Sequence, residues 1–569
     1  MPRQTRLDPA LPVLLALTLL LFLALWARLA GTDWDQGAGL HPDERHMLFV
    51  SQDMARALDD PAHAGLGLTG WMGEASPLNP HLGDRSHVYG DLPVLAVTLA
   101  ARATGQTGWF EMMRLGRQTS AILDGLSVLA VFLAARLLAG DRRALLAAAL
   151  YAAMPSALQL ANFFTVEAWL SAAAAWALVP MAALATGRGG LRSAAMAGVF
   201  TGLALACKIT GGALALPGIA ALVLAWRGGM GWRRAGLGLL AALAATLVTF
   251  RIANPFAFAG VFTLSQDWIG DFQGLGAVAL DWGFPPNWQW LAGYGPLAFL
   301  RDFALFGCGP VATVLLLSLP VSRLWRAAAL PLAAALAFVL PPLVSPVAAL
   351  RYAAPALPAL ALAAALAPGA LLARGRVALP LALALWWGAG AWRLHDGQHP
   401  RIAASVWLWT LPAGTTLLNE TAWDEGLPAI VEVTPGQGRL WPDHDGHFTL
   451  KTLDMVAPDS AEKADAMAAL MAESDFLILS SDRQSGVMPR LTDRFPLTSA
   501  HYAALFSGQA CFAPVLSIDR GFPLPFLPFD DSWAQEPWRI YDHPKVRIFL
   551  REACFDAAAY AEKLKAALP

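Results

Sequence analysis

The sequence has little charge for its length. Only 14% of its 569 residues are Asp, Glu, Lys or Arg, whereas a typical soluble domain is about 25% charged. The mean hydropathy is +0.48, and this composition excludes a soluble enzyme. Acidic and basic residues nearly cancel, with a formal net charge of −2, so the chain has no overall positive field to hold a nucleic acid.

Cysteine and lysine are also scarce. The four cysteines, at 207, 308, 511 and 554, show no C-x-x-C spacing, which argues against a zinc ribbon or a thioredoxin-like redox site. Lysine occurs only at positions 208, 451, 463, 545, 563 and 565. Lys208 is therefore the sole lysine of the apolar part of the chain, and it becomes a candidate functional residue.

Long apolar runs fill the first two thirds of the sequence. Between Leu11 and Trp392 they follow one another closely, most near the ~20 residues that a helix needs to cross the hydrocarbon core. They predict about eleven membrane spans. These are expected at residues 11–29, 119–138, 144–160, 168–185, 194–207, 211–226, 235–249, 303–319, 327–344, 352–372 and 377–392.

Residues 393–569 have the charge and turn content of a globular domain. Alternating runs at 415–420, 429–434, 475–481 and 539–550 predict strands, and the run SAEKADAMAALMAES predicts a helix. The expected fold class is thus a polytopic α-helical membrane protein, residues 1–392, with a C-terminal soluble α/β domain, residues 393–569.

One apolar stretch, 91–104, decides the topology. If this stretch does not cross the membrane, the arginines of the short loops all lie on the same side of the membrane, as the positive-inside rule requires. These are Arg136, Arg142, Arg143, Arg188, Arg192, Arg227, Arg233, Arg234, Arg323, Arg326, Arg374 and Arg376, on the side of Arg3 and Arg6. We therefore expect an interfacial helix at 91–104. The N-terminus then lies inside, while the long loop 30–118 and the soluble domain lie outside.

An acidic motif, HPDE, follows the first span in this long loop. Pro42 favours a helix start, and Asp43 and Glu44 then lie in its first turn, facing the membrane surface. A carboxylate placed there can take the proton of a hydroxyl or amine acceptor as it attacks an activated carbon. The alternative is a helix cap with a solvated charge pair.

Further motifs occur in one order along the membrane part: NPHLGDRSHVYGDLP, RLGRQTSAILDGL, MPSALQLANFFTVEAWL, GLALACKITGG, RIANPFAF and RYAAPALPAL. Together they resemble the C-type (GT-C fold) membrane glycosyltransferases that use polyprenyl-phosphate-linked sugars, the family of the protein O-mannosyltransferases and the lipid A aminoarabinose transferase. The runs HPRIAASVWLWTLPAGTTLLNETAWDEGLP, DFLILSSDRQSGVMPRL and WRIYDHPKVRIF extend the resemblance through the soluble domain.

The resemblance implies a reaction and its site residues. Asp43 matches the family's catalytic base, and Glu167 stands where the family usually has an aspartate. The donor would be a sugar on polyprenyl phosphate, the acceptor a glycan, lipid or protein, and transfer would invert the anomeric carbon. No nucleotide is implied, and no Asp-x-Asp clamp stands in a strand–turn context.

A departing phosphate needs cations near the outer face of the bilayer. Lys208, Arg251 and Arg351, with the adjacent Tyr352, lie at the ends of predicted spans and are the candidates for binding the carrier phosphate. The family has a lysine at the place of Lys208. For the two arginines, the alternative is snorkelling to lipid headgroups.

Other polar and aromatic residues have competing interpretations. Asp124 and Arg117 are spaced to form a buried pair on one helix, most simply a structural one. The histidines 41, 46, 81 and 87, with Asp43, Glu44 or Glu167, offer the ligand types of a divalent metal site, the one cofactor left open. The tryptophans at 282, 288 and 290 suit an interfacial belt better than a sugar platform.

The sequence thus predicts a glycosyltransferase of a bacterial inner membrane, with its C-terminal domain in the periplasm. In that oxidising space a disulfide between Cys511 and Cys554 can form. A transporter or flippase of a lipid-linked sugar is the alternative, but no inverted repeat with paired broken helices supports it.

Overall fold

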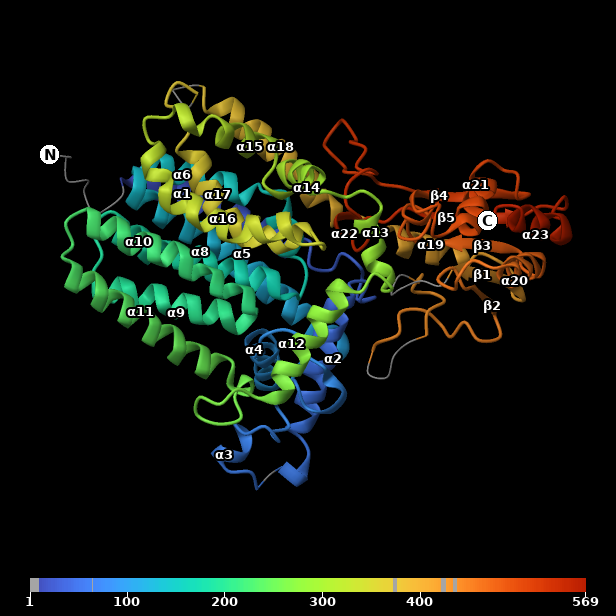
Figure 1. The fold of residues 1–569 in the computed structure, drawn as a ribbon, viewed down its shortest axis with the longest axis horizontal. Helices are drawn as coiled ribbons and strands as arrows, with labels where there is room; N and C mark the ends of the chain where they lie inside the picture. Colours follow the sequence, from blue (N-terminus) through green and yellow to red (C-terminus); the bar gives the residue numbers. More distant parts are fainter. Residues whose placement is uncertain (1–9, 64, 372–375, 421–425, 433–436) are drawn as a thin grey trace.

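The structure, a computed structural model, describes residues 10–63, 65–371, 376–420, 426–432 and 437–569. A bundle of long helices forms one side of the molecule and a small sheet domain the other, with the first loop and α12 (Gln266–Leu280) between and below them (Figure 1). Arg3, Arg6 and Arg374, and the end of the strand expected at 429–434, lie outside the described residues.

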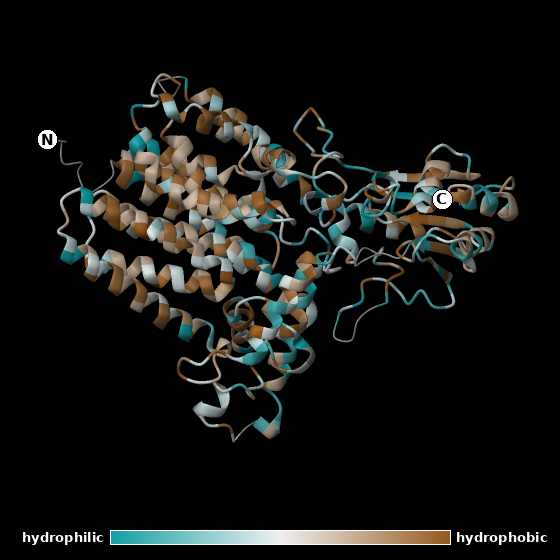
Figure 2. Ribbon diagram, in the orientation of Figure 1, coloured by the Kyte–Doolittle hydropathy of each residue, from teal (hydrophilic) through white to brown (hydrophobic). Residues whose placement is uncertain are grey.

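The bundle consists of apolar helices. In the described part of the chain, six helices are long and apolar enough to cross a membrane: Leu11–Ala30 (α1), Trp109–Ala139 (α5), Val166–Ala185 (α8), Ile209–Arg227 (ending in α10, Ala215–Arg227), Trp232–Ala253 (α11) and Trp325–Val344 (containing α16, Ala329–Val344). Shorter apolar helices are Leu191–Cys207 (α9) and Leu350–Ala365, which ends in α17 (Leu357–Ala365). Hydrophobic residues dominate these helices and polar ones the loops below (Figure 2). The chain is therefore a helical membrane protein.

Two expected spans are not single straight helices. The run 144–160 is divided into α6 (Asp141–Ala152) and α7 (Pro155–Leu160), because Pro155 begins a new helix. The run 303–319 bends by 115° between Pro296–Gly307 and Pro310–Leu317 (α15). Gly309 lies at the bend with φ 83°, and the proline after it cannot continue the preceding helix. The last apolar helix is α18 (Ala378–Leu394).

The first loop contains two helices that matter for the site. α2 (Pro42–Ala57) begins at Pro42, and α4 (Asp91–Thr104) occupies the range expected for the interfacial helix. The two pack against each other, and α4 also contacts α5 and α9. The short α3 (Leu68–Trp71) lies at the tip of the loop.

The C-terminal part contains a five-stranded sheet in the order β2-β1-β3-β5-β4. β2 and β3 lie parallel to β1, whereas β5 is antiparallel to both β3 and β4. The strands are Thr415–Glu420 (β1), Phe448–Leu453 (β2), Phe476–Leu479 (β3), Phe512–Ile518 (β4) and Val546–Arg551 (β5). The helices around them are α19 (Pro400–Leu408), α20 (Ala461–Ala472), α21 (Pro496–Phe506), α22 (Glu536–Arg539) and α23 (Ala557–Lys565). Cys511 and Cys554 form a disulfide.

The strand predictions were partly right. β1 coincides with the expected strand at 415–420, but residues 429–432 form a turn and bend rather than a strand. β2 and β4 were not expected. Both are edge strands of the sheet, and neither shows a regular alternation of buried and exposed residues that would have marked it in the sequence.

The expected pairing of Arg117 with Asp124 is wrong. Asp124 accepts hydrogen bonds from Arg28 of α1 and from the Tyr151 hydroxyl of α6, so it links three helices inside the bundle. Arg117 instead lies between Asp35 and Glu44. Helical spacing indicated that both residues are buried on α5, but it carried no information about partners on other segments.

Candidate functional site

Four charged residues from separate segments meet where the bundle joins the first loop. Asp43 lies in the first turn of α2, Glu167 in the first turn of α8, Lys208 directly after α9, and Arg351 in the helical turn Leu350–Ala356. Arg351 Nη1 is 2.9 Å from Asp43 Oδ2, and Lys208 Nζ is 3.0 Å from Glu167 Oε1. We call these four residues the charged cluster. They alternate in sign, so their net charge is zero.

Tyrosine rings surround the cations of the charged cluster. Lys208 Nζ lies 4.8 Å from the ring centre of Tyr352 and 5.6 Å from that of Tyr89. The guanidinium of Arg351 lies 5.8 Å from the Tyr352 ring and 6.0 Å from the Tyr541 ring. Aromatic faces stabilise cations without neutralising them, so both cations remain able to bind an anion.

The charged cluster has unused hydrogen-bonding capacity. Within the described residues, Arg351 Nε is buried without a hydrogen-bond partner, and the contact of Arg351 Nη1 with Asp43 Oδ2 is an ion pair without hydrogen-bond geometry. Buried polar groups are normally satisfied, so Arg351 Nε points to a ligand or water beside the ion pair. Burial would raise the pKa of Asp43, but the nearby charges of Arg351 and Lys208 outweigh it and lower that pKa to about 2. Asp43 is therefore ionised at neutral pH.

The backbone near Lys208 is held by the first loop. The Gly90 amide donates a hydrogen bond to the Cys207 carbonyl at 2.9 Å. A Cβ atom at position 90 would come within 2.0 Å of the Ala206 carbonyl oxygen, so only glycine permits this contact. The contact fixes the lysine relative to the start of α4.

Glu44 lies in a different network from Asp43. Its Oε2 is 2.6 Å from Arg117 Nη2, and its Oε1 accepts the Phe164 amide at 2.9 Å. Arg117 also binds Asp35 through Nη1 at 2.7 Å. Glu44 is fully buried in these contacts and fastens the start of α2 to α5 and to the loop before α8.

Arg251 does not join the charged cluster. Its guanidinium donates to the carbonyls of Val261, Gly260 and Pro255 and lies over the Phe258 ring, so its contacts are those of its own loop.

The histidine–carboxylate metal site that the sequence left open is not assembled among the described residues. His81 lies between Asp91 and Asp271 and binds one with each ring nitrogen, whereas His46 stacks on His87. Among the described residues, the only group with metal-ligand spacing is Asp443, His444 and Asp445, in the C-terminal domain, and it includes none of the four histidines considered above.

Trp288 and Trp290 are not a lipid-facing belt. Both are buried, and the Trp288 ring packs on Phe495 of the soluble domain with centroids 4.6 Å apart. Trp288 joins the loop before α14 (Pro296–Asp302), including α13 (Trp288–Leu291), to the soluble domain, whereas Trp290 packs on Tyr294 of its own loop. The prediction failed because a Trp-rich loop looks the same whether lipid or protein covers it.

The soluble domain contributes to the site through residues 531–543. Tyr541 stacks on His41, with ring centroids 4.1 Å apart, beside the charged cluster. Gln535 Oε1 accepts the backbone amide of Leu350 at 2.9 Å, directly before Arg351. The sequence contained the motif WRIYDHPKVRIF, but nothing in it indicated contact with the membrane part.

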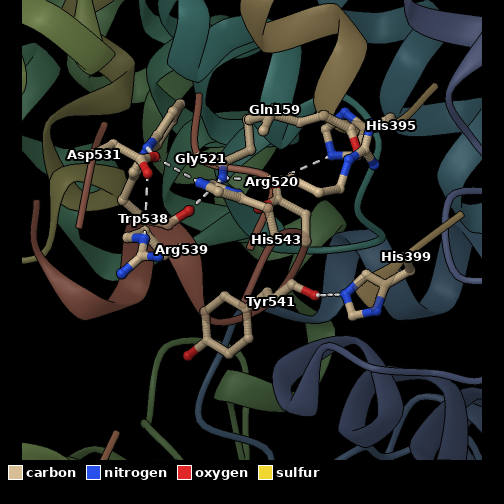
Figure 3. Close-up of polar contacts among 12 residues, drawn as sticks. Gln159, His395, His399, Arg520, Gly521, Asp531, Trp538, Arg539, Tyr541 and His543 are labelled. Carbon is tan, nitrogen blue, oxygen red and sulfur yellow. Dashed lines mark hydrogen bonds and ion pairs between the residues drawn. The ribbon is translucent and has the colours of Figure 1, made fainter. Parts of the chain in front are cut away.

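A buried polar network holds this segment in place (Figure 3). Gln159 of α7 donates to the Trp538 carbonyl and to Asp542, and His399 donates to the Tyr541 carbonyl. His395, at the end of α18, lies 3.2 Å from Asp542. His543 lies between Asp542 and Asp531, 2.8 Å from the latter. The position of Tyr541 therefore depends on charges buried between the two parts of the molecule.

Comparisons with known proteins confirm the resemblance expected from the sequence. Residues 111–252 match the family described as dolichyl-phosphate-mannose-protein mannosyltransferase. The matched family and the solved relatives below are glycosyltransferases of the GT-C fold. No curated protein sequence matches the chain.

The solved relatives are distant. Archaeal oligosaccharyltransferase AglB from Archaeoglobus fulgidus, in complex with an inhibitory peptide and a dolichol-phosphate, is 13% identical, with a TM-score of 0.49 over 92% of this chain and 74% of that one. ArnT from Cupriavidus metallidurans in the apo state is 15% identical, with a TM-score of 0.48 over 83% of this chain and 94% of that one. ArnT bound to undecaprenyl phosphate is 16% identical, with a TM-score of 0.44 over the same shares.

The buried network predicts a loss of stability at alkaline pH. Burial would lower the pKa of His543, but the charges of Asp542 and Asp531 outweigh it and raise that pKa to about 9, from 6.5. Because His543 binds its proton more tightly in the folded state, the protonated form stabilises that state. This stabilisation is complete below pH 6.5 and is lost as the pH rises through 9. The free energy of unfolding should fall by about 3 kcal/mol across this window.

Thermal unfolding of the full chain in detergent, followed from pH 6 to 10, checks this. His543→Gln should be less stable at pH 6 and should lose most of the pH dependence between 6.5 and 9. An equal slope in the wild type and the variant would show that another group titrates.

Proposed function

We propose that the protein transfers a sugar from a polyprenyl-phosphate carrier to an acceptor at the outer face of the membrane, with the charged cluster as the active site. The observation that carries the proposal is the pairing of two cations with two carboxylates at a partly buried junction, where Arg351 Nε still lacks a hydrogen-bond partner among the described residues. The family match over 111–252 supports the same reaction class.

Lys208 and Arg351 would bind the carrier phosphate. Both reach the site from the bundle side and both retain a positive charge among tyrosine rings. A phosphate would replace the carboxylates as their partner, and charge-assisted hydrogen bonds to phosphate are the stronger kind. Tyr352 lies against both cations and would pack on the carrier.

Asp43 would act as the base. In the protein without ligand its carboxylate is paired with Arg351, which makes it a weak base. When a phosphate shares the charge of Arg351, that pull weakens and the proton affinity of Asp43 rises. Donor binding would thus prepare the carboxylate for proton transfer.

The proposed step is a direct displacement. The acceptor oxygen or nitrogen attacks the anomeric carbon, the bond from that carbon to the phosphate oxygen breaks, and the acceptor proton passes to Asp43. The electron pair leaves with the phosphate, whose charge Lys208 and Arg351 stabilise. Because the nucleophile enters opposite the leaving group, the configuration inverts. Glu167 would orient Lys208.

The proposed orientation places the site and the soluble domain outside a bacterial inner membrane. The disulfide between Cys511 and Cys554 supports this side, since disulfides persist in oxidising compartments. The shared site of Asp43 and Glu167 supports an α4 that does not cross the membrane, because a crossing there would separate the two carboxylates.

Asp43→Asn should reduce turnover by about 10² to 10⁴, because a general base contributes that much. The assay supplies purified protein with polyprenyl-phosphate-linked hexoses or pentoses and extracted envelope glycans, and mass spectrometry detects the added sugar. Asp53→Asn, an exposed carboxylate on the same helix, is the matched control and should keep full activity. A loss of only twofold in Asp43→Asn would place the base elsewhere.

Lys208→Met and Arg351→Met should each weaken binding of undecaprenyl phosphate by about 1.5 to 3 kcal/mol, as expected when a charge-assisted hydrogen bond is lost. Glu167→Gln should act in the opposite direction, because it removes a negative charge that competes for Lys208. Arg251→Met is the control for general charge effects and should bind normally. Calorimetric titration in detergent measures all four; unchanged affinity in both cation variants would exclude the assignment.

Cysteine labelling tests the orientation. In a variant without native cysteines, a single cysteine near Gly446 should react with a membrane-impermeant maleimide on intact spheroplasts. A cysteine replacing Arg142 should react only after lysis. The reverse pattern would place the charged cluster on the cytoplasmic side.

A further inference from the structure

A cleft of about 580 Å³ lies between the first loop and the soluble domain. One wall is formed by residues around the start of α2, including Leu40, Arg45 and Phe49, and the other by residues of the sheet domain. The proposed reaction does not use this cleft, because the charged cluster lies among α2, α8, α9 and the turn at Leu350–Ala356.

The cleft lies at the carboxyl ends of the three parallel strands. Glu420 ends β1, Thr452 is the penultimate residue of β2, and Ser480 follows β3 directly. From β1 the chain goes to β2 on one side and then to β3 on the other. In open α/β sheets, ligands bind at this edge, where the order of the strands reverses.

The side chains lining the cleft suit a neutral polar ring. Trp441 offers an aromatic face, and Asn419 and Thr452 can exchange hydrogen bonds with hydroxyl groups. The charged residues are two arginines, Arg45 and Arg439, and two glutamates, Glu420 and Glu432, so their charges cancel.

The cleft and the proposed base share one helix. Asp43 and Arg45 are two residues apart in α2, and at 3.6 residues per turn their side chains leave the helix in directions about 200° apart. Asp43 faces Arg351, whereas Arg45 lines the cleft. A group bound in the cleft therefore lies about one helix diameter, ~10 Å, from the base.

We propose that this cleft binds a neutral saccharide unit of the acceptor glycan, one that is remote from the unit receiving the sugar. The inference rests on the proposed function and names its acceptor as a glycan rather than a protein or a simple lipid. The soluble domain then has two roles, since residues 531–543 complete the charged cluster and the parallel strand ends hold the acceptor.

Saturation-transfer NMR on the full chain in lipid nanodiscs tests the cleft directly. The probes are free glucose, galactose, mannose, arabinose and N-acetylglucosamine at millimolar concentration. At least one of these sugars should give a saturation-transfer signal. Its affinity, measured by titrating that signal, should fall roughly tenfold in Trp441→Ala, as when an aromatic contact worth about 1.4 kcal/mol is lost. Glu432→Ala, at an exposed lining position, is a second variant less prone to affect folding and should also weaken the signal.

Two further measurements separate this inference from the proposed function. Asp43→Asn should retain the saccharide signal, and Trp441→Ala should retain its affinity for undecaprenyl phosphate. If no saccharide binds, or if binding is the same in both cleft variants, the cleft assignment is wrong while carrier binding still stands. If undecaprenyl phosphate fails to bind the wild type, the proposed function itself is wrong.

Discussion

Two ion pairs, Arg351 with Asp43 and Lys208 with Glu167, hold together segments that are far apart in the sequence. Charges that are partly withdrawn from water are stabilised by a partner of opposite sign, so each pair favours the packing of the segments that carry it. The folding of the first loop onto the bundle, the close approach at Gly90 and the start of α8 at Val166 all serve this arrangement. In the proposed reaction the same pairs are exchanged, because the phosphate takes the cations and the carboxylate becomes available for the proton.

The structural charges stand apart from the charged cluster. Asp124 with Arg28 and Tyr151 lies inside the bundle, and Glu44 with Arg117 and Asp35 lies beneath the start of α2. In both, the carboxylates are satisfied by cations and by backbone or hydroxyl donors. Asp43 and Arg351 are more accessible, with 22% and 20% of their side chains exposed, against 3% and 0% for Asp124 and Arg28. A ligand can reach the accessible ion pair, whereas the buried pair is closed to it.

Much of the fold and part of the site could be predicted from the sequence. Apolar length predicted most membrane helices, and α4 has the bounds that were expected for the stretch 91–104. The rarity of lysine pointed to Lys208, which does lie beside Glu167. The bend at Gly309 and the partners of Arg117 were not predicted, because periodicity describes one helix at a time and contains no information on contacts between helices. The approach of Tyr541 to His41 was missed for the same reason, since 500 residues of chain separate them.

The most direct test is an experimental structure of the protein with undecaprenyl phosphate bound in lipid nanodiscs. The account predicts density for the phosphate between Lys208 Nζ and the Arg351 guanidinium, with Arg351 turned from Asp43 toward the phosphate and the cleft at Trp441 still open. A phosphate bound at Arg251, or an Arg351–Asp43 pair unchanged beside an ordered carrier, would contradict the claim that the charged cluster is the site of sugar transfer.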